Sequence, residues 1–321
     1  MSGHDNSKST EGVVAEIAPK ECRDRLRADI ANCELLGETQ DAKKILLYHH
    51  RQSSVLMNEI GRLREESFRL VGEGTGRERD LDEYDAHYMH IVLWDEEQGE
   101  VVGAYRLRGT DQLDVQEDSD RLIVNSPLYT ASLFDYLPAS RSILEHGLEL
   151  GRSFVQPQYW GSKSLEYLWY GIAAFLRLHP QYRYLFGAVS ISNTLSAPAK
   201  DLLIYFYQHY YGTETKYLVC HHPYQLSEAS KKHLDQFFEG LDLKEGFIKL
   251  KKQLRYLGFA VPVLYKQYAE LSEPGGTRFL GFNIDSDFSD CVDGFVVVDI
   301  DQMSGQKRKR YGLLTHRLVS S

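Results

Sequence analysis

The chain has 321 residues, of which 42% are hydrophobic and 26% are charged. This balance excludes a disordered protein, and the length suits one large domain with or without an appendage. The formal net charge of -9 excludes a general nucleic-acid binder, which needs a basic surface. The 4 cysteines lie far apart without a Cys-x-x-Cys pair, so neither a disulfide framework nor a zinc knuckle is expected.

The first 50 residues predict an appendage to the main domain. Residues 1–20 are polar and predict a disordered tail. Residues 21–50 are charged and helix-prone, with an interruption near Gly37, and predict a helical extension of two helices. No apolar run approaches the roughly 18 residues of a spanning helix, so we expect a cytoplasmic protein that at most contacts the inner membrane peripherally.

Periodicity and turn signals place the remaining elements. Helices are expected at residues 55–70, 164–179, 197–211 and 263–271, and within a helical segment at 226–260. One strand is expected to end at residue 95, after an acidic lead that begins at residue 82. Further strands are expected at 101–107, 149–155, 182–191 and 294–300. Residues 109–145 look acidic and irregular, and residues 306–321 predict a basic C-terminal tail.

The stretch from residue 149 to residue 164 has the clearest chemical character. Its extended run is stopped by Pro157, which cannot donate to a strand ladder, and a polar loop then leads to Ser164, a suitable helix N-cap. Backbone N–H groups of this loop and the positive end of the helix favour an anion, and Lys163 adds a full charge. The loop therefore predicts a place for a phosphate.

Two charged side chains on the strand before this loop form the candidate site. In a regular strand Glu149 and Arg152 would point to opposite faces, because side chains alternate with a period of two. A bulge at Gly151 would bring both charges onto one face beside an opened ladder. An ordinary ion pair followed by a plain connecting loop is the alternative interpretation.

A further charge, Arg106, falls in the second strand of a predicted hairpin. A charged residue there is either exposed at an edge or paired with an opposite charge. The nearest plausible partners are Asp82 and Asp85, in the acidic segment that leads into the hairpin.

Other patterns are less specific. Gly72, Gly74 and Gly76 resemble a nucleotide-binding loop, but they follow a helix and lack the Lys-Ser/Thr ending, which favours a flexible loop. The basic runs at 244–255 and 307–310 suit a solvated face, an acidic partner or anionic headgroups.

The order of these segments resembles the bacterial lipid N-acyltransferases that make ornithine and glycine lipids. That family is a branch of the Gcn5-related acyltransferase (GNAT) fold near the acyl-homoserine-lactone synthases. The matching positions are Asp82, Tyr84, Asp85 and His90, then Gly103, Arg106 and Leu107, then 149–153, then Leu168, Trp169, Gly171 and Ile172, and last Pro262, Leu264, Lys266 and the displaced Tyr268. The glycine-rich loop of the broader superfamily is reduced to Gly161, and residues before 50 have no counterpart.

The resemblance implies an α/β (α+β) fold of the GNAT type over residues 51–305. Its mixed, mostly antiparallel central sheet would be splayed between two strands and flanked by helices. The pantetheine of the acyl donor would fill the gap beside strand 149–155. No cofactor or metal is implied other than the acyl carrier protein (ACP) or coenzyme A thioester that donates the acyl chain, and the partners would be ACP and an amino-acid acceptor.

The resemblance also implies roles for individual residues. Glu149 would act as a base, and Arg152 or Arg106 would hold an amino-acid carboxylate. Backbone N–H groups at 151–153 would stabilise the oxyanion. The expected catalytic residues are Glu149, Arg152 and Ser153, the substrate-binding residues Asp82, Asp85 and Arg106, and the donor-binding residues Val155, Gln156, Gly161, Ser162 and Lys163.

We therefore expect an N-acyltransferase that transfers a long acyl chain, often 3-hydroxylated in this family, from ACP or coenzyme A to the amine of an amino acid. This would be the first step of an aminolipid pathway. One alternative is a signal synthase that makes an acyl-homoserine lactone or a soluble N-acyl amino acid. Another is an acyl-binding or regulatory protein with a decayed site, which the joint presence of Glu149, Arg152, Arg106 and Asp85 disfavours.

Overall fold

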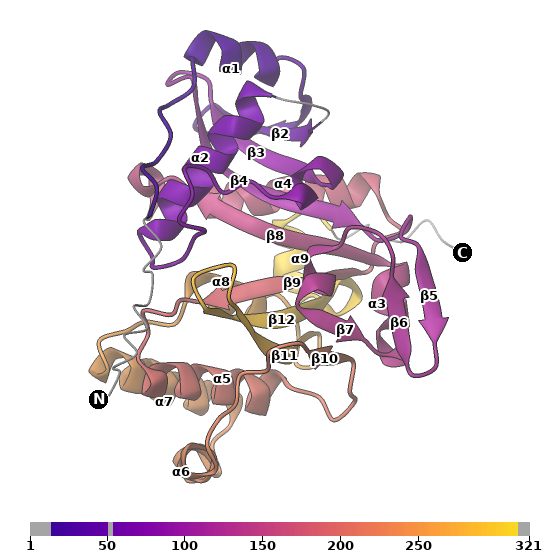
Figure 1. The fold of residues 1–321 in the computed structure, drawn as a ribbon, viewed down its shortest axis with the longest axis vertical. Coiled ribbons are helices and arrows are strands. Elements are labelled where there is room, and N and C mark those ends of the chain that lie inside the picture. Colours follow the sequence, from indigo (N-terminus) through magenta and orange to yellow (C-terminus); the bar gives the residue numbers. More distant parts are fainter. Residues whose placement is uncertain (1–13, 51–53, 314–321) are drawn as a thin grey trace, which may run out of the picture.

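The computed structural model describes residues 14–50 and 54–313, which form two sheets and the helices around them (Figure 1). The strands of the large sheet are, in spatial order, β1 (Glu34–Glu38), β2 (Lys43–His49), β3 (Met89–Asp95), β4 (Glu100–Gly109), β8 (Gly147–Val155), β9 (Tyr184–Ile191), β12 (Cys291–Asp299) and β11 (Thr277–Asp285). Those of the small sheet are β10 (Leu218–Cys220), β7 (Phe134–Tyr136), β6 (Arg121–Val124) and β5 (Val115–Asp118).

The α-helices are α1 (Arg23–Ile30), α2 (Val55–Arg69), α3 (Arg141–Glu145), α4 (Ser164–Leu178), α5 (Ala197–Tyr211), α6 (Glu228–Phe238), α7 (Leu243–Tyr256), α8 (Val263–Ala269) and α9 (Gly305–Arg310). Short 3₁₀ turns are η1 (Glu83–His87), η2 (Tyr129–Ser132), η3 (Pro138–Ser140), η4 (Pro157–Tyr159) and η5 (Ile300–Gln302). The segment predicted to be helical at 226–260 thus contains α6 and α7.

Apolar stripes place the main helices on opposite faces of the large sheet. On one face α4 and α5 bury residues such as Leu168, Ile172 and Phe206 in the principal core. On the other face Leu56 and Ile60 of α2 form a second core with the first strands, which α2 crosses in Figure 1. The small sheet packs on that same face at β9 and β12. The architecture is therefore a mixed α/β fold around one large sheet.

The junction of β8 and β9 is the irregular point of the large sheet. These strands are parallel, and their pairing extends only from Gly147 opposite Tyr184 to Glu149 opposite Phe186. Beyond this point β8 continues along β4, and β9 continues along β12. The other pairings described in this sheet are antiparallel. The predicted splay of a mostly antiparallel sheet is thereby confirmed.

The predicted helical extension at 21–50 is wrong for its second half. Only α1 is helical, and residues 34–49 form the hairpin β1–β2, which extends the large sheet by pairing with β3. The apolar run at 45–48 is buried on both faces of this hairpin, so tertiary burial outweighs the local helix propensity.

The predicted tails are also partly wrong. In the described part of the first tail, the Ala15 and Ala18 amides donate to the carbonyls of Gly76 and Glu78, at 2.9 and 3.1 Å. Part of the second tail forms α9, where Arg310 Nε donates to Glu166 at 2.7 Å. These contacts anchor both segments to the domain, while residues 1–13 and 314–321 lie outside the described chain.

Two segments of sheet were missed. Residues 109–145 look irregular because their strands β5, β6 and β7 are only 4, 4 and 3 residues long. Strand β11 lies where no strand was expected. The short strands gain their stability from packing Phe134 and Tyr136 on Phe295 of the large sheet. No described helix is long and apolar enough to cross a membrane.

Gly187 offers a test of the junction. A methyl group on Gly187 would collide with the backbone carbonyl of Leu150, where β8 and β9 separate. Neither strand can move away from the added methyl group without weakening its pairing on the other side, β8 with β4 or β9 with β12. We therefore expect Gly187→Ala to lower the free energy of unfolding by about 1–3 kcal/mol. Urea unfolding measures this. Gly37→Ala, in β1 with nothing within 4 Å of the added carbon, is the control, and equal midpoints for the two variants would contradict the crowding.

Candidate active site

A bulge in β8 carries the first candidate residues. Gly151 pairs with Arg106 of β4, but Arg152 and Ser153 together face the single Tyr105. The residue with left-handed backbone is Arg152, at φ +46°, so the bulge lies one residue later than predicted. Gly151 keeps its place in the ladder, and the strain of order 1 kcal/mol falls on a residue whose side chain has strong tertiary partners.

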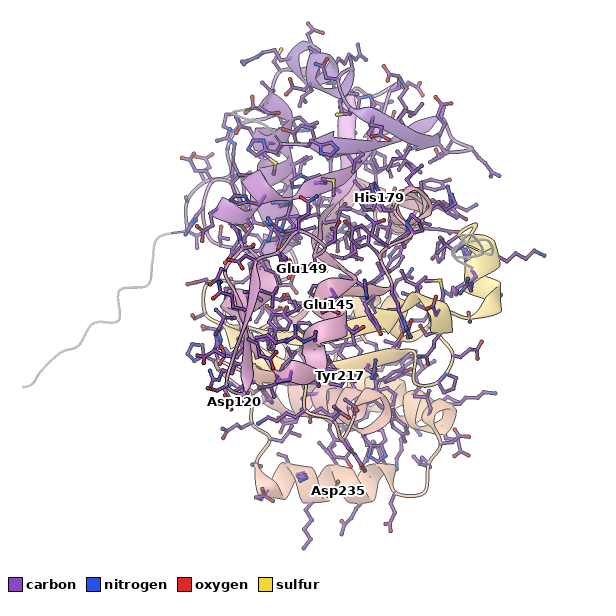
Figure 2. The ribbon with its side chains drawn as sticks, turned by 90° about the vertical axis from the view of Figure 1, so that its right-hand side faces the viewer. Asp120, Glu145, Glu149, His179, Tyr217 and Asp235 are labelled. Atoms are coloured by element: carbon purple, nitrogen blue, oxygen red, sulfur yellow. The ribbon has the colours of Figure 1, made fainter. Side chains whose placement is uncertain are left out.

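Glu149 lies near the centre of the molecule (Figure 2). It contacts Thr130, the neighbour of the Tyr129 ring on which Arg152 stacks, so both side chains lie on the same face of β8. Its side chain is only 2% exposed. One carboxylate oxygen accepts from the Tyr88 hydroxyl, and the other accepts from both the hydroxyl and the amide of Thr130, the latter at 2.8 Å. Burial raises the pKa of Glu149, while these hydrogen bonds oppose the rise.

The predicted pairing of Arg106 with the acidic segment is confirmed. Its Nη1 lies 2.5 Å from Asp82 Oδ1 and 3.2 Å from Asp85 Oδ1. The two aspartates form a capping box at η1: Asp82 accepts from the Asp85 amide at 3.2 Å, and Asp85 accepts from the Asp82 amide at 3.1 Å. Local sequence therefore orients both carboxylates before Arg106 binds them.

Asp85 is the central acceptor of this buried group. Besides Arg106, it binds Arg64 Nη1 at 2.8 Å and His90 Nε2 at 3.3 Å. Burial raises the pKa of Asp85, but Arg64, the His90 hydrogen bond and Arg106 outweigh it and hold the pKa well below its usual range. Burial lowers the pKa of His90 to about 4, so this imidazole is neutral at pH 7.

Arg152 joins the same group through Asp82. Its Nε lies 3.2 Å from Asp80 Oδ2, and its Nη2 lies 3.7 Å from Asp82 Oδ2. Its guanidinium also stacks on Tyr129 and Phe288, with 4.9 and 4.4 Å to the ring centroids. Among the ion pairs of the described residues, none joins Arg152 to Glu149, so the simple ion-pair alternative does not hold.

Ser153, the third predicted catalytic residue, faces the opposite side of the sheet. Its side chain hydrogen-bonds Tyr105, whose hydroxyl lies 3.4 Å from that of Tyr268 in α8. On this side Tyr265 donates to the carbonyl of Val189 at 2.8 Å, in the open part of β9. The bulge therefore sends Arg152 and Ser153 to different faces, and α8 covers the gap on the Ser153 side.

The predicted donor-binding residues lie at the end of β8 and in the loop to α4: Val155, Gln156, Gly161, Ser162 and Lys163. The Gln156 carboxamide turns away from the loop and donates to the carbonyl of Val101. Gly161 has φ +78° and lies exposed, and Lys163 is exposed directly before α4. Several backbone amides of this loop already donate within it: Trp160 to Pro157, Ser162 to Tyr159 and Ser164 to the Ser162 hydroxyl. The Gln156 side chain is bonded to β4.

Sequence reasoning missed the residues that hold the predicted ones in place: Arg64, Asp80, Tyr88, Tyr129 and Thr130. A signal existed for Arg64, which is 0% exposed. It lies four residues after Ile60 on the apolar stripe of α2, and a charge on such a stripe needs a buried partner. For Tyr129 and Thr130 the irregular segment gave no signal.

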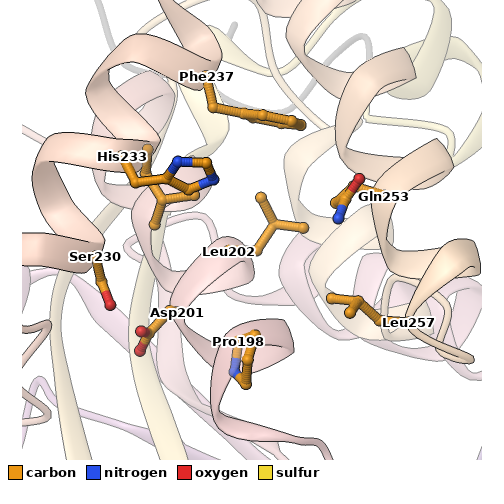
Figure 3. A pocket seen from close by; sticks show the side chains of 9 residues that line it. Pro198, Asp201, Leu202, Ser230, His233, Phe237, Gln253 and Leu257 are labelled. Carbon is orange, nitrogen blue, oxygen red and sulfur yellow. The ribbon is translucent and has the colours of Figure 1, made fainter.

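Possible metal ligands and cavities can also mark a functional site. Among the described residues, no three His, Cys, Asp or Glu side chains converge as metal ligands. A cavity of about 160 Å³ lies between α5, α6 and α7, where Leu202, Phe237 and Leu257 line it (Figure 3). None of the predicted site residues borders this cavity.

Asp85→Asn tests the buried group. It leaves Arg64 and Arg106 without their shared anion, and we expect a loss of about 3–5 kcal/mol in the free energy of unfolding. Because folding lowers the pKa of Asp85, the wild type keeps this contribution above the unfolded value near 3.9 and loses it as the pH falls further. Urea unfolding at several pH values measures both effects. Glu83→Gln, exposed in η1, is the control, and equal loss in both variants would contradict the assignment.

Comparisons with known proteins find relatives of this chain. The family profile described as "Acetyltransferase (GNAT) domain" matches residues 63–170, from within α2 into α4. A glycine N(alpha)-acyltransferase of Phocaeicola vulgatus is 30% identical over 315 residues, which cover 94% of this chain and 92% of that protein. An L-ornithine N(alpha)-acyltransferase of Brucella abortus is 28% identical over 274 residues, covering 83% and 84%.

Among solved structures, the CoA-dependent acyl-homoserine lactone synthase BjaI with MTA aligns with 74% of this chain and 71% of that one. The sequence identity is 12% and the TM-score is 0.31. This likeness is too weak to add to the fold described above.

Proposed function

This chain belongs to the lipid N-acyltransferase family, and on that premise we propose that it transfers a long fatty acyl chain from an ACP or coenzyme A thioester to a free amino acid. Membership makes it an acyltransferase with a GNAT domain that acts on an amino-acid amine. The product would be a monoacylated amino acid, the starting compound of an aminolipid.

The observation that carries the proposal is the open gap between β8 and β9 beside Arg152. In the gap the inner edge of β8 lacks its ladder partner, so backbone N–H groups near the bulge are available to the carbonyl of a thioester. Donors fixed in this way stabilise the developing oxyanion without reorganising. The donor's phosphates would lie at the Gly161–Lys163 loop and the start of α4.

Arg152 is the better candidate for the acceptor's carboxylate. Arg106 is 1% exposed, and its Nη1 already serves two aspartates. Arg152 keeps 11% of its side chain exposed and has longer contacts with its carboxylate partners. Its planar guanidinium can bind a carboxylate at two points. We assign Arg106 to positioning Asp82 and Asp85, and Arg152 to the substrate.

The direct test offers the purified protein palmitoyl-coenzyme A and palmitoyl-ACP with each of the common amino acids and ornithine, and identifies products by mass spectrometry. We expect an N-acyl amino acid and release of thiol. A lactone formed from S-adenosylmethionine would favour the signal synthase. Thioester binding without turnover would favour the acyl-binding protein.

Arg152→Lys tests the carboxylate contact. Lysine keeps the charge beside Asp80 but loses two-point binding, so we expect the KM for the amino acid to rise roughly tenfold or more with a smaller change in kcat. Steady-state thiol release measures both constants. Arg141→Lys, exposed in α3, should behave as wild type. An unchanged KM in Arg152→Lys would place the carboxylate elsewhere.

Lys163→Glu tests the donor. Fewer backbone N–H groups would surround a phosphate here than in a glycine-rich loop, so Lys163 should supply more of the attraction. Because ACP is strongly acidic, the positive charge of Lys163 should also favour its docking. We expect the KM for acyl-ACP to rise steeply and to become less sensitive to salt, with little change at saturation. The control is Lys231→Glu, an equal charge change on α6. An unchanged KM at low ionic strength would show that the carrier docks elsewhere.

A further inference from the structure

A second set of charges lies close enough to Arg152 for its charge to affect them. Asp293 lies on β12 opposite Ser190 of β9, three residues beyond Gly187 where β8 leaves the ladder. It is 1% exposed, and its Oδ1 accepts from the Ser190 hydroxyl at 2.7 Å. Within the described chain its Oδ2 has no hydrogen-bond donor. A deeply buried carboxylate with one unpartnered oxygen therefore lies on β12 beyond the point where β8 separates from β9, close enough to Arg152 for the two charges to interact.

The glycine loop after α2 adds Glu73 to this group. Gly72 and Gly74 have φ +73° and +102°, and their carbonyls accept from Ser192 at 3.2 Å and Ser289 at 2.7 Å. The loop is thereby tied to the end of β9 and to the β11–β12 turn. Glu73 stands between the two ties, close enough to Asp293 and Arg152 for their charges to affect it. The loop expected to be flexible instead places a carboxylate over the gap.

These residues combine one cation with excess negative charge. Arg152 has the ring of Tyr129 beside it, and the Tyr129 hydroxyl donates to Asp285 Oδ2 at 2.7 Å. Burial raises the pKa of Asp293 to about 7, with Asp285 adding to the rise and Ser190 and Arg152 opposing it. Burial and Asp293 raise the pKa of Glu73 to about 7 as well. An ammonium group placed between these carboxylates would remove the repulsion.

We infer that Asp293, supported by Glu73, binds the ammonium group of the amino-acid acceptor and takes a proton from it, while Arg152 holds the carboxylate. This inference rests on the proposed function and names the acceptor site. Glu149 was the base expected from the sequence, but both of its oxygens already accept hydrogen bonds from Tyr88 and Thr130. Asp293 retains a free oxygen, and β12 places it beside the open end of β9.

The step balances as follows. The ammonium gives one proton to Asp293, and the lone pair of the neutral amine forms the N–C bond to the thioester carbonyl. Collapse of the tetrahedral adduct breaks the C–S bond, and the second proton lost by nitrogen converts the leaving thiolate to a thiol. The products are the amide, the free thiol and the proton that Asp293 passes to solvent.

Asp293→Asn is the variant that tests this role, and the donor is palmitoyl-coenzyme A or palmitoyl-ACP, whichever the wild type uses. At pH 7 we expect kcat/KM for the amino acid to fall about 100-fold or more, as for loss of a general base. In the wild type, kcat/KM for the amino acid should fall as the pH drops below about 7. This fall, the acid limb of the profile, should be absent in Asp293→Asn and should remain in Glu149→Gln. The groups that interact with Asp293 are Arg152, Asp285, Glu73, Ser190, Tyr129, Tyr265 and Cys291.

The thermal midpoint supplies a readout apart from activity. Because folding raises the pKa of Asp293 to about 7, stability from this group is full below the unfolded value near 3.9 and is lost as the pH rises toward 7. The Tm of Asp293→Asn relative to wild type should therefore rise between pH 5 and 8. Asp290→Asn, exposed in the β11–β12 turn, is the matched control and should change neither Tm nor rate.

The outcomes separate the two proposals. If the wild type makes no N-acyl amino acid, the proposed function fails whatever Asp293 does. If the wild type is active and folded Asp293→Asn keeps its kcat/KM and its acid limb, the inference alone is overturned. If the limb disappears in Glu149→Gln and remains in Asp293→Asn, Glu149 is the base.

Discussion

The early separation of β8 from β9 is the constraint on which the site depends. Each strand is committed to an outer neighbour, β8 to β4 and β9 to β12, so the two cannot close on each other beyond Glu149. Backbone groups on the inner edges then lack ladder partners, and a buried backbone group that stays unpaired is costly. Tyr265 satisfies one of them, the Val189 carbonyl. Under the proposed function, the gap would give a thioester backbone contacts that a complete ladder would have used.

Buried charge fixes the walls of this gap. Asp82 lies between Arg106 and Arg152, and therefore links the strand that carries the bulge to the neighbouring β4. Such pairs add little net stability, because desolvation of the ions offsets much of their attraction. Their value here is geometric: contacts with Asp80 and Asp82 on one side and with the rings of Tyr129 and Phe288 on the other restrict where the Arg152 guanidinium can lie. The strain at φ +46° on Arg152 is compatible with folding because these partners hold the side chain in position.

The features that could be predicted from the sequence are those that depend on neighbouring residues in the chain or on a single buried charge. Helix α5 was expected at its observed residues, and the pairing of Arg106 with Asp85 followed from a buried charge that needs a partner. The bulge was placed at Gly151 because glycine adopts unusual backbone conformations most easily. The structure assigns the left-handed φ to Arg152 instead, because contacts from Asp80 and Tyr129, distant in sequence, outweigh intrinsic preference. No local pattern shows that Thr130 of η2 would donate to Glu149.

The opposite charges around the gap would act on the two ends of an amino acid together. In a free amino acid the carboxylate stabilises the neighbouring ammonium, so the amine resists losing its proton. When Arg152 neutralises the carboxylate, the amine pKa moves toward the value near 8 of an α-amine without that charge. A carboxylate whose pKa is raised to about 7, such as Asp293, then accepts the proton at a small cost. A side-chain amine with a pKa near 10.4 has no adjacent carboxylate to neutralise and would remain protonated. The arrangement therefore favours acylation of the α-amine, because only that amine is altered by how its own carboxylate is bound.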